Sequence, residues 1–469
     1  MSHEVYDTLP PLSSQLQTLL KGDWEQEVLS QLPADAQHHA RELGAFVRPR
    51  ELKCVGDLLR GLLAYVLCAA SFRHLGAWSV LIGLANLSHV AWQKRLRAAR
   101  GWLLWLLVQR LSVTCPCPQT GAVRIIEVDA TRLKEPGGCG DDWRLHLAYD
   151  LMAGQFVDVK VSDRHTAEGF RLFDWRRGDI IVADRGYSRR PELALVLRAG
   201  ADVIVRLAPQ KVPLLDRQGR PFEVLSWLKE QGQGQHRAKV ALQDEHGTFL
   251  GRILACALPE EAAQRARAKE RKRASKQQRA VQEDTLFLCG WLLIFTSLQE
   301  SLWPDEQVLA LYRARWQIEL LIKRMKQLLK LAQLRGQTAL TNEATILALL
   351  VAWSLLQPEV SYAREVLTQV VEQWAQTPSL TAAEPDAVSS VATVSSWSTT
   401  SLEVQTFRMM VQGFWTLARL RVCLPYLARF LCSRRQGRDH QESDIHRLLL
   451  AHPALSGSGS SLLFDCSSA

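Results

Sequence analysis

The spacing of hydrophobic and polar positions divides the chain into helical and strand-like regions. Before about residue 110, apolar side chains recur at helical spacing, as in the strongly apolar stretch Val55–Ala70. A second helix is predicted over Ser88–Leu111, with Ser88 as its N-cap. This helix carries a group of cations that fits either contact with DNA phosphates or a solvated basic face. The group consists of Lys94, Arg95, Arg97 and Arg100.

The pattern changes at Val123, where short β-branched and apolar runs indicate strands. The predicted order is β-β-β-α-β-α-β, and the first and fourth strands end in Asp129 and Asp184. A meander that crosses over to a parallel strand makes these two strands neighbours in one mixed sheet, with both aspartates at one edge. We therefore expect an α/β fold with an RNase H-like mixed-sheet core. The strands are Val123–Asp129, Trp143–Leu151, Phe156–Asp163, Asp179–Asp184 and Asp202–Leu207, and the helices are Thr166–Asp174 and Arg190–Ala199.

A β-rich stretch with a polar helix then interrupts the core. Strands are predicted within Val212–Leu228 and Val240–Leu258, with turns at Arg217–Arg220 and His246–Gly247. The helix Glu260–Glu283 is rich in arginine and lysine, so it can hold phosphates or stay solvated; we favour phosphates. The core resumes with an apolar strand at Leu286–Phe295.

The helix predicted over Leu311–Lys330 has one apolar face and one cationic face. At helical spacing, the cationic face also presents a single carboxylate, Glu319. By itself, this face fits an ordinary solvated surface with a Glu319–Lys323 pair. Its polar members are Tyr312, Arg315, Glu319, Lys323, Lys326 and Lys330.

Composition adds a modest bias towards an anionic partner. The formal net charge is +9, and 47% hydrophobic with 22% charged residues is typical of a soluble globular protein. The ten cysteines follow no zinc spacing, and the N-terminus has no signal-peptide pattern, so we expect a reduced cytoplasmic protein. The apolar run Ala344–Leu356 is too short to span a bilayer and predicts a buried helix, without membrane association.

Asp129, Asp184 and Glu319 together predict a cation site, because carboxylate oxygens suit Mg²⁺ or Mn²⁺. Two such ions, about 4 Å apart, can support an in-line phosphoryl displacement. Three further carboxylates compete for this role, with surface pairing or helix capping as their structural alternative. They are Glu127, Asp163 and Glu168.

These motifs resemble those of the DDE transposases of bacterial insertion sequences that carry a YREK signature. That signature falls on Tyr312, Arg315, Glu319 and Lys326 with every gap matching the family. VDAT at Val128–Thr131 and ADRGY at Ala183–Tyr187 are similar to its first and second aspartate motifs, and LRGQT at Leu334–Thr338 also matches. The resemblance extends from about Val55 to Leu356.

The resemblance implies cut-and-paste movement of the element, with two divalent ions held by Asp129, Asp184 and Glu319. It also implies that Tyr312, Arg315 and Lys326 grip phosphates at the element end. In some members of the family, a tryptophan at the position of Trp291 captures a flipped base, with a second tryptophan before the glutamate and an arginine supporting the flipped strand. Plain core packing is the alternative for Trp291. The corresponding residues here are Trp291, Trp316 and Arg206.

The expected partners are double-stranded DNA, as terminal inverted repeats and target, and a second copy of the chain in a homodimeric DNA complex. A bacterial, nucleoid-associated protein is expected. The predicted domains are a helical N-terminal DNA-binding domain, the core in two parts around a β-rich insertion, a linker and C-terminal helices. Their ranges are 1–112, 113–207, 208–285, 286–376, 377–400 and 401–469.

Two other functions share these features. An RNase H-fold nuclease would have the same carboxylates, but the long insertion and the YREK face count against it. A transposase-derived DNA-binding protein without catalysis would have the same surfaces, but all three carboxylates are intact. No GxxxxGK[ST], GxGxxG, HExxH or GxSxG pattern is present, so ATP-dependent, dinucleotide-dependent, zinc-protease and hydrolase functions lack support.

Overall fold

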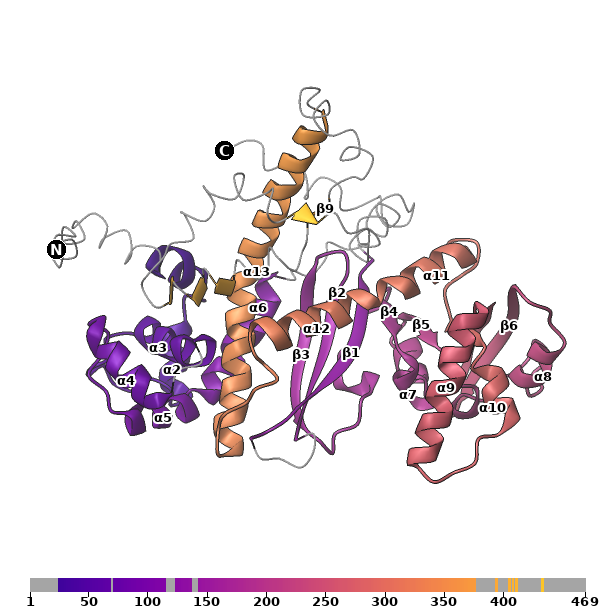
Figure 1. The fold of residues 1–469 in the computed structure, drawn as a ribbon, viewed down its shortest axis with the longest axis horizontal. Helices are drawn as coiled ribbons and strands as arrows, with labels where there is room; N and C mark the ends of the chain where they lie inside the picture. The colour runs from indigo at the N-terminus through magenta and orange to yellow at the C-terminus, as the bar shows by residue number, and fades with distance from the viewer. Residues whose placement is uncertain are drawn as a thin grey trace, which may run out of the picture. The chain divides into compact units, whose positions relative to one another are not determined.

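The structure is a computed structural model, and its chain divides into two compact units (Figure 1). The helical unit comprises Met1–Pro116, Arg132–Trp143 and Leu321–Gln441, and the sheet unit comprises Cys117–Thr131, Arg144–Leu320 and Glu442–Ala469. The structure describes residues 24–68, 71–114, 123–136, 142–376, 393–394, 404–405, 407–408, 410–411 and 432–433.

An eight-stranded sheet organises the sheet unit, in the order β3-β2-β1-β4-β5-β8-β7-β6. The pairs β1–β4 and β4–β5 are parallel, whereas β5–β8, β8–β7 and β7–β6 are antiparallel, so the predicted mixed sheet is confirmed. The strands are β1 Ile125–Leu133, β2 Trp143–Asp150, β3 Gln155–Asp163, β4 Ile180–Ala183, β5 Asp202–Arg206, β6 Gln235–Asp244, β7 Gly247–Ala257 and β8 Trp291–Thr296.

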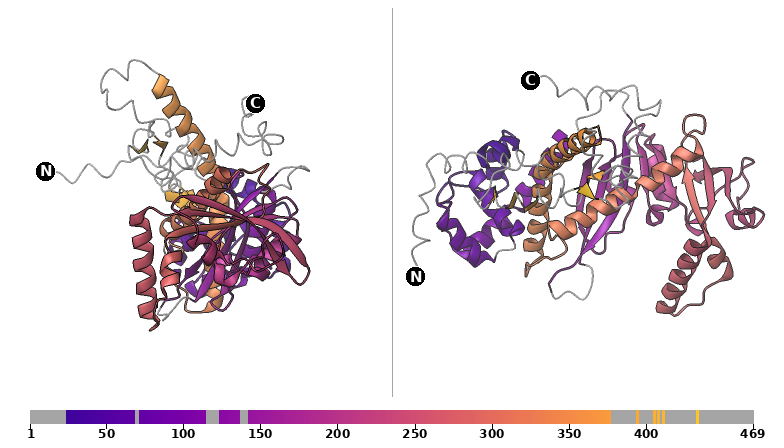
Figure 2. Two further views of the ribbon diagram at one scale, coloured as in Figure 1. Left: turned by 90° about the vertical axis from the view of Figure 1, so that its right-hand side faces the viewer. Right: turned by 45° about the horizontal axis from the view of Figure 1, so that its top comes forward.

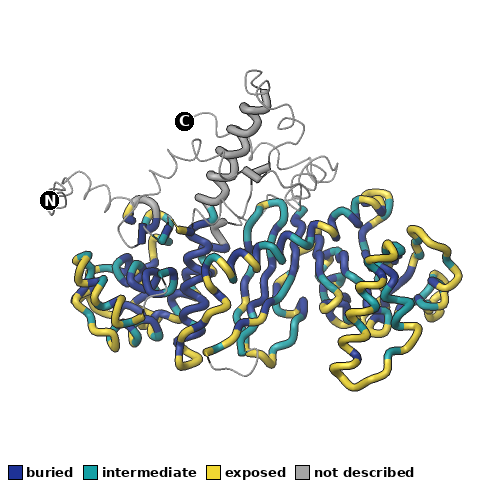
Figure 3. The backbone as a smooth tube through the Cα atoms, in the orientation of Figure 1, coloured by how far each residue is buried: buried dark blue, intermediate teal, exposed yellow. Residues whose placement is uncertain are grey.

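Helices cover both faces of this sheet, because its central strands are apolar on both sides. Alternate residues of β1 belong to different clusters: Ile126 packs with Leu193 of α7 (Arg190–Arg198), and Ile125 packs with Val308 of α11 (Asp305–Ala314). In Figure 3 the central strands are accordingly dark blue. The α/β core with helices on both faces agrees with an RNase H-like fold.

The β-rich stretch after β5 extends this same sheet. The hairpin of β6 and β7 turns between Asp244 and Gly247, as predicted, and β7 pairs with β8. The prediction of a strand within Val212–Leu228 is wrong: the stretch holds an isolated bridge at Leu215 and the short helix α8 (Val224–Lys229). Likewise, Thr166–Asp174 forms only a 3-10 turn, η3 (Phe170–Leu172).

The basic helix is shorter than predicted. It is α9, Glu260–Lys276, and only Ala263 and Ala274 are buried. The helix ends where Gln278 takes a positive φ of 52°, a conformation that cannot continue a right-handed helix. A separate helix, α10 (Glu283–Leu288), takes the beginning of the strand predicted at Leu286–Phe295. Figure 2 shows α9 projecting from the β6–β7 end of the sheet.

The helical unit contains the predicted N-terminal helices. Ser88 caps α5, where its hydroxyl accepts a hydrogen bond from the Ala91 N–H at 3.2 Å, as predicted. The helix predicted over Ser88–Leu111 is two helices, α5 and α6, separated at Ala99. The helices are α2 Ala36–Glu42, α3 Val55–Leu67, α4 Phe72–Leu81, α5 His89–Ala98, α6 Arg100–Thr114 and α13 Ala339–Gln376, preceded by the short turns η1 Trp24–Val28 and η2 Leu29–Gln31.

Two of the four cations on α5 and α6 bind within the protein. Arg97 Nε donates a hydrogen bond to Thr341 Oγ1 at 2.9 Å, and Arg100 Nη1 forms an ion pair with Glu343 at 2.8 Å. Both partners lie at the start of α13. These two side chains therefore have a structural role that the sequence pattern did not separate from DNA contact.

The predicted buried helix at Ala344–Leu356 is confirmed as part of α13. Among the described residues, the stretch Ala339–Gln357 is long and apolar enough to cross a membrane, but 83% of it is buried inside the protein. Such burial is typical of the core helix of a soluble protein. The linker predicted at 377–400 lies outside the described residues except for β9 (Thr393–Val394), which pairs with β10 (Cys432–Ser433). The helices predicted after residue 400 also lie largely outside them.

Candidate active site

Two parallel strands bring Asp129 and Asp184 to the same edge of the sheet. In the register of β1 and β4, the last paired residues are Val128 and Ala183, and the two aspartates follow directly. The strand β1 continues to Leu133, so Asp129 does not end its strand as predicted; only the pairing with β4 ends there. The juxtaposition expected from the chain order is present.

Glu319 lies in the first turn of α12 (Trp316–Leu328), and its charge acts on Asp129. Burial raises the pKa of Asp129 to about 6, and the charges of Glu319 and Asp184 act in the same direction. The Ala130 backbone N–H and the charge of Arg315 lower this pKa in part. Three carboxylates therefore interact at this edge, where their mutual repulsion favours a bound cation.

The cationic face is not on one helix, contrary to the prediction for Leu311–Lys330. The chain forms α11 and α12 with Arg315 at the break between them. Arg315 Nη1 forms an ion pair with Glu319 Oε1 at 2.6 Å, and its guanidinium lies 5.8 Å from the ring centre of Tyr312. Burial acts to lower the pKa of Arg315, but the charges of Tyr312 and Glu319 raise it overall. Arg315 therefore stays protonated beside the carboxylates.

Tyr312 connects this group to Arg206, the last residue of β5. The Tyr312 side chain is buried, and burial raises the pKa of its hydroxyl, while the charges of Arg315 and Arg206 lower it. Two cations, Arg315 and Arg206, therefore act on Tyr312 beside the carboxylate edge.

The donor atoms suit a hard divalent cation. One oxygen of Asp129 accepts the Ala130 N–H at 2.7 Å, and one oxygen of Asp184 accepts the Arg185 N–H at 2.5 Å. Glu319 is engaged by Arg315, and among the described residues no three Asp, Glu, His or Cys side chains enclose a point where an ion could sit. The carboxylate oxygens are suitable ligands for such a cation, but in the described part of the chain they do not surround a common point.

Comparison with known proteins decides the family. The model of the transposase DDE domain matches residues 122–355. The chain is also 35% identical over 342 residues to the InsL protein for insertion sequence element IS186A of Escherichia coli (strain K12), covering 70% of this chain and 92% of that protein. The chain belongs to the DDE transposases of bacterial insertion sequences.

Other transposases show the same relationship. The transposase for IS421 of Escherichia coli is 35% identical over 343 residues, covering 70% of this chain and 92% of that protein. The transposase for IS231B of Bacillus thuringiensis subsp. berliner is 26% identical over 217 residues, covering 42% of this chain and 45% of that protein. Membership implies an enzyme that acts on DNA and depends on divalent metal ions. The YREK subgroup stays a prediction.

Tyr187 lies within the electrostatic influence of Asp129 and Asp184, and the sequence interpretation did not single it out. Its side chain is only 1% exposed, and its hydroxyl has no hydrogen-bond partner among the described residues. Burial raises the pKa of this hydroxyl well above its usual value, and the charges of Asp129 and Glu168 raise it further. The signal was present in the sequence, because Tyr187 ends the ADRGY motif that carries Asp184.

The competing carboxylates occupy three different environments. Asp163 accepts backbone N–H bonds from His165 and Thr166, both at 3.0 Å, which is a turn-capping role. Glu168 lies beside the second aspartate motif: a Cβ on Gly186 would be 3.1 Å from its Oε2. Glu127 is fully buried on β1 and accepts a hydrogen bond from the Ile318 N–H.

The two tryptophans and Lys326 lie in distinct surroundings. Trp291 begins β8, is 7% exposed and packs in the core with Phe287, at 6.4 Å between ring centres, and His236, at 6.0 Å. Trp316 begins α12 and is half-buried next to Arg315, and Lys326 is half-buried in the last turn of α12. Trp291 therefore has the surroundings of a core residue.

Proposed function

We propose that Asp129, Asp184 and Glu319 are the catalytic carboxylates and hold two ions of Mg²⁺ or Mn²⁺. The observation that carries this proposal is the register of β1 and β4, together with the effect of Glu319 and Asp184 on the pKa of Asp129. When bound, such ions activate the attacking oxygen and stabilise the leaving oxygen of a phosphoryl displacement. The transposase would then cut at the terminal inverted repeats of its own element and join the ends to target DNA.

The residues around the carboxylates would orient the DNA. Arg315 now pairs with Oε1 of Glu319, so a metal held by that oxygen would displace the guanidinium. The released guanidinium is a strong, bidentate phosphate ligand. We assign phosphate contacts to Tyr312, Arg315 and Lys326, and support of the cleaved strand to Arg206.

Trp291 and Trp316 are proposed to capture a base flipped from the DNA end. Stacking one extruded base on an indole would offset the strain of a bent strand by about 1–3 kcal/mol. Trp316 is half-buried beside Arg315, which supports this role. For Trp291, the buried position requires the indole to leave its core contacts, so core packing remains its competing role.

We also propose a role for each segment of the chain. Residues 1–112 would bind DNA, residues 113–207 and 286–376 would form the catalytic core, and residues 208–285 would be an insertion that holds DNA through α9. The segments 377–400 and 401–469 would be a linker and C-terminal helices. We also propose a homodimer in the DNA complex and a cytoplasmic, nucleoid-associated location in a bacterium.

A cleavage assay on DNA with the element's terminal repeats tests the catalytic assignment. Changing Asp129, Asp184 or Glu319 singly to Ala should abolish metal-dependent cleavage and strand transfer. Binding to the ends should stay within a few-fold, because phosphate contacts provide most of the affinity. The matched control is Asp163→Ala, which removes an exposed capping carboxylate and should leave cleavage intact.

Two outcomes would contradict the proposal. Normal cleavage by Asp184→Ala with Mg²⁺ would mean that the triad is assigned wrongly. Binding without any cleavage by the unaltered protein, with either Mg²⁺ or Mn²⁺, would favour a DNA-binding protein without catalysis.

A further inference from the structure

Glu127 is a fully buried carboxylate on the strand that carries Asp129. Side chains alternate between the faces of a strand, so Ile125, Glu127 and Asp129 point to the same side of β1. Ile125 packs there in one cluster with α11, and Asp129 responds there to the charges of Glu319 and Arg315. Glu127 lies between these two contacts.

The carboxylate of Glu127 accepts a hydrogen bond from the backbone N–H of Ile318, with a distance of 3.1 Å between Oε2 and N. Ile318 lies in the first turn of α12, directly before Glu319. The first N–H groups of a helix lack carbonyl partners within that helix, and a carboxylate is favourable at this positive end. Since α11 ends at Ala314, Glu127 supplies from a distant strand the acceptor that the broken helix lacks.

We propose that Glu127 is a positioning residue, which fixes the helix carrying Glu319 against the strand carrying Asp129. This inference rests on the proposed roles of Asp129 and Glu319 as metal ligands. Groups that hold a metal or a reacting atom must be kept within a fraction of an ångström, which outer contacts of this kind achieve. Glu127 thus links two elements that are far apart in the sequence through one buried hydrogen bond, directly before Glu319 on one element and two residues before Asp129 on the other.

The test compares three variants in the full-length protein. Glu127→Gln keeps an oxygen that can accept the Ile318 N–H, Glu127→Leu has similar bulk without an acceptor, and Ile125→Ala loosens the same face without touching the hydrogen bond. Mn²⁺ binding without DNA, followed by electron paramagnetic resonance, gives a readout that does not require catalysis. Cleavage rate, the Mg²⁺ concentration for half-maximal cleavage, and stability in urea complete the measurements.

Glu127→Leu should weaken Mn²⁺ binding and slow cleavage by about 10- to 100-fold, as expected for loss of an outer contact. Glu127→Gln should keep Mn²⁺ binding and the cleavage rate within about threefold of the unaltered protein, since its amide oxygen can accept the same hydrogen bond. Ile125→Ala should lose stability in urea while Mn²⁺ binding and the Mg²⁺ requirement stay unchanged.

Unchanged Mn²⁺ binding and cleavage in Glu127→Leu would overturn the inference, and so would a Glu127→Gln variant as defective as Glu127→Leu. If Glu127→Leu does not fold, Glu127→Ala is used and judged by the same two measurements. Failure of the proposed function is distinguishable, because Asp129→Ala would then bind Mn²⁺ and cleave DNA normally.

Discussion

Arg315, at the break between two helices, forms an ion pair with Glu319 in the first turn of the second helix, with 2.6 Å between Nη1 and Oε1. The guanidinium therefore compensates the third carboxylate before any metal binds. The same charge also lowers the pKa of Asp129, which burial raises to about 6. Arg315 thus affects two of the three proposed ligands in the absence of DNA.

Replacing Arg315 with alanine should move the acid limb of the cleavage profile to higher pH. Asp129 binds metal only when it is ionised, and losing the Arg315 charge raises its pKa further, which extends the protonated range upwards. Cleavage rates measured across the pH range around this pKa, at a saturating Mn²⁺ concentration, check the shift. The control is Arg313→Ala, an exposed arginine on α11, which should leave the profile in place.

Four exposed cations of α9 should contribute to non-specific DNA affinity. Lys269, Arg271, Lys272 and Lys276 have no ion pair among the described residues, so each can neutralise a phosphate. Their joint replacement by Gln should flatten the salt dependence of DNA binding by about three to four units of slope. Binding isotherms at several salt concentrations measure this slope.

The same helix region offers a matched control with equal charge removal. Four other arginines already pair with carboxylates of α9, so replacing them with Gln should change the slope less. They are Arg265, Arg267, Arg273 and Arg279. If both fourfold variants flatten the salt dependence equally, α9 acts only through its net charge. If neither variant changes the slope, α9 faces solvent and does not contact DNA.

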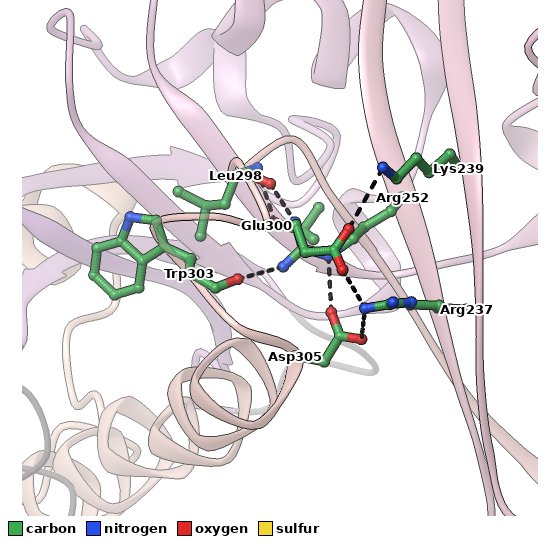
Figure 4. A network of polar contacts seen from close by, with 8 residues as sticks. Arg237, Lys239, Arg252, Leu298, Glu300, Trp303 and Asp305 are labelled. Carbon is green, nitrogen blue, oxygen red and sulfur yellow. Dashed lines mark hydrogen bonds and ion pairs between the residues drawn. The ribbon is translucent and has the colours of Figure 1, made fainter.

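Arg252 should stabilise the connection that leads from β8 into α11 (Figure 4). Its buried guanidinium binds Asp305 at 2.9 Å and the carbonyl of Trp303 at 2.5 Å, and it also donates to the carbonyl of Leu298. Arg252→Met should lower the free energy of unfolding by about 3–5 kcal/mol, because it removes the buried donor of Asp305 Oδ1 and of two carbonyls. Urea denaturation measures the loss.

Arg237→Ala is the control for Arg252. Arg237 contacts the same carboxylate of Asp305 at 3.5 Å and also pairs with Glu300, but its side chain is 56% exposed. Exposed pairs contribute little, so the loss should stay below about 1 kcal/mol. Similar losses in both variants would show that burial does not separate the two arginines.

His146 should make stability fall in acid. Burial lowers its pKa to about 4, with the charge of Arg144 acting in the same direction, and its Nδ1 has no hydrogen-bond partner among the described residues. As the pH falls, His146 in the unfolded chain binds a proton first, at about pH 6.5. The stability contribution is therefore complete above that pH and is lost as pH falls towards 4.

Urea titrations of the protein and of His146→Asn at a series of pH values isolate this contribution as a difference. The difference should change between about pH 6.5 and 4 and level off outside that window. His165→Asn, an exposed histidine, serves as control. A constant difference for His146→Asn would contradict the assignment.

Trp291→Phe should separate base capture from core packing. Trp291→Ala would leave a cavity in the core costing about 3–5 kcal/mol, so loss of function in that variant would be ambiguous. Phenylalanine fills much of the space and should preserve folding. If Trp291 captures a base, first-strand nicking stays near normal while hairpin formation or its resolution slows; normal hairpin kinetics would leave Trp291 as a core residue.

Local sequence determined the central architecture and the proposed carboxylates. The strand order and its crossover to β4 follow from short apolar runs, and parallel pairing then brings the residues after Val128 and Ala183 together. The hairpin of β6 and β7 and the buried segment of α13 were also predicted from the sequence, because hydrophobic periodicity and turn residues are local signals.

The tertiary structure decided how these elements meet. The predicted helix Leu311–Lys330 has uniform helical propensity, yet it breaks at Arg315, and a carboxylate 191 residues away in the sequence caps its second half. The contact of Trp291 with His236 and the internal pairing of Arg97 likewise depend on partners supplied by distant segments. Periodicity reports which face of an element is apolar, whereas a polar contact depends on which distant side chain folding brings within about 3 Å.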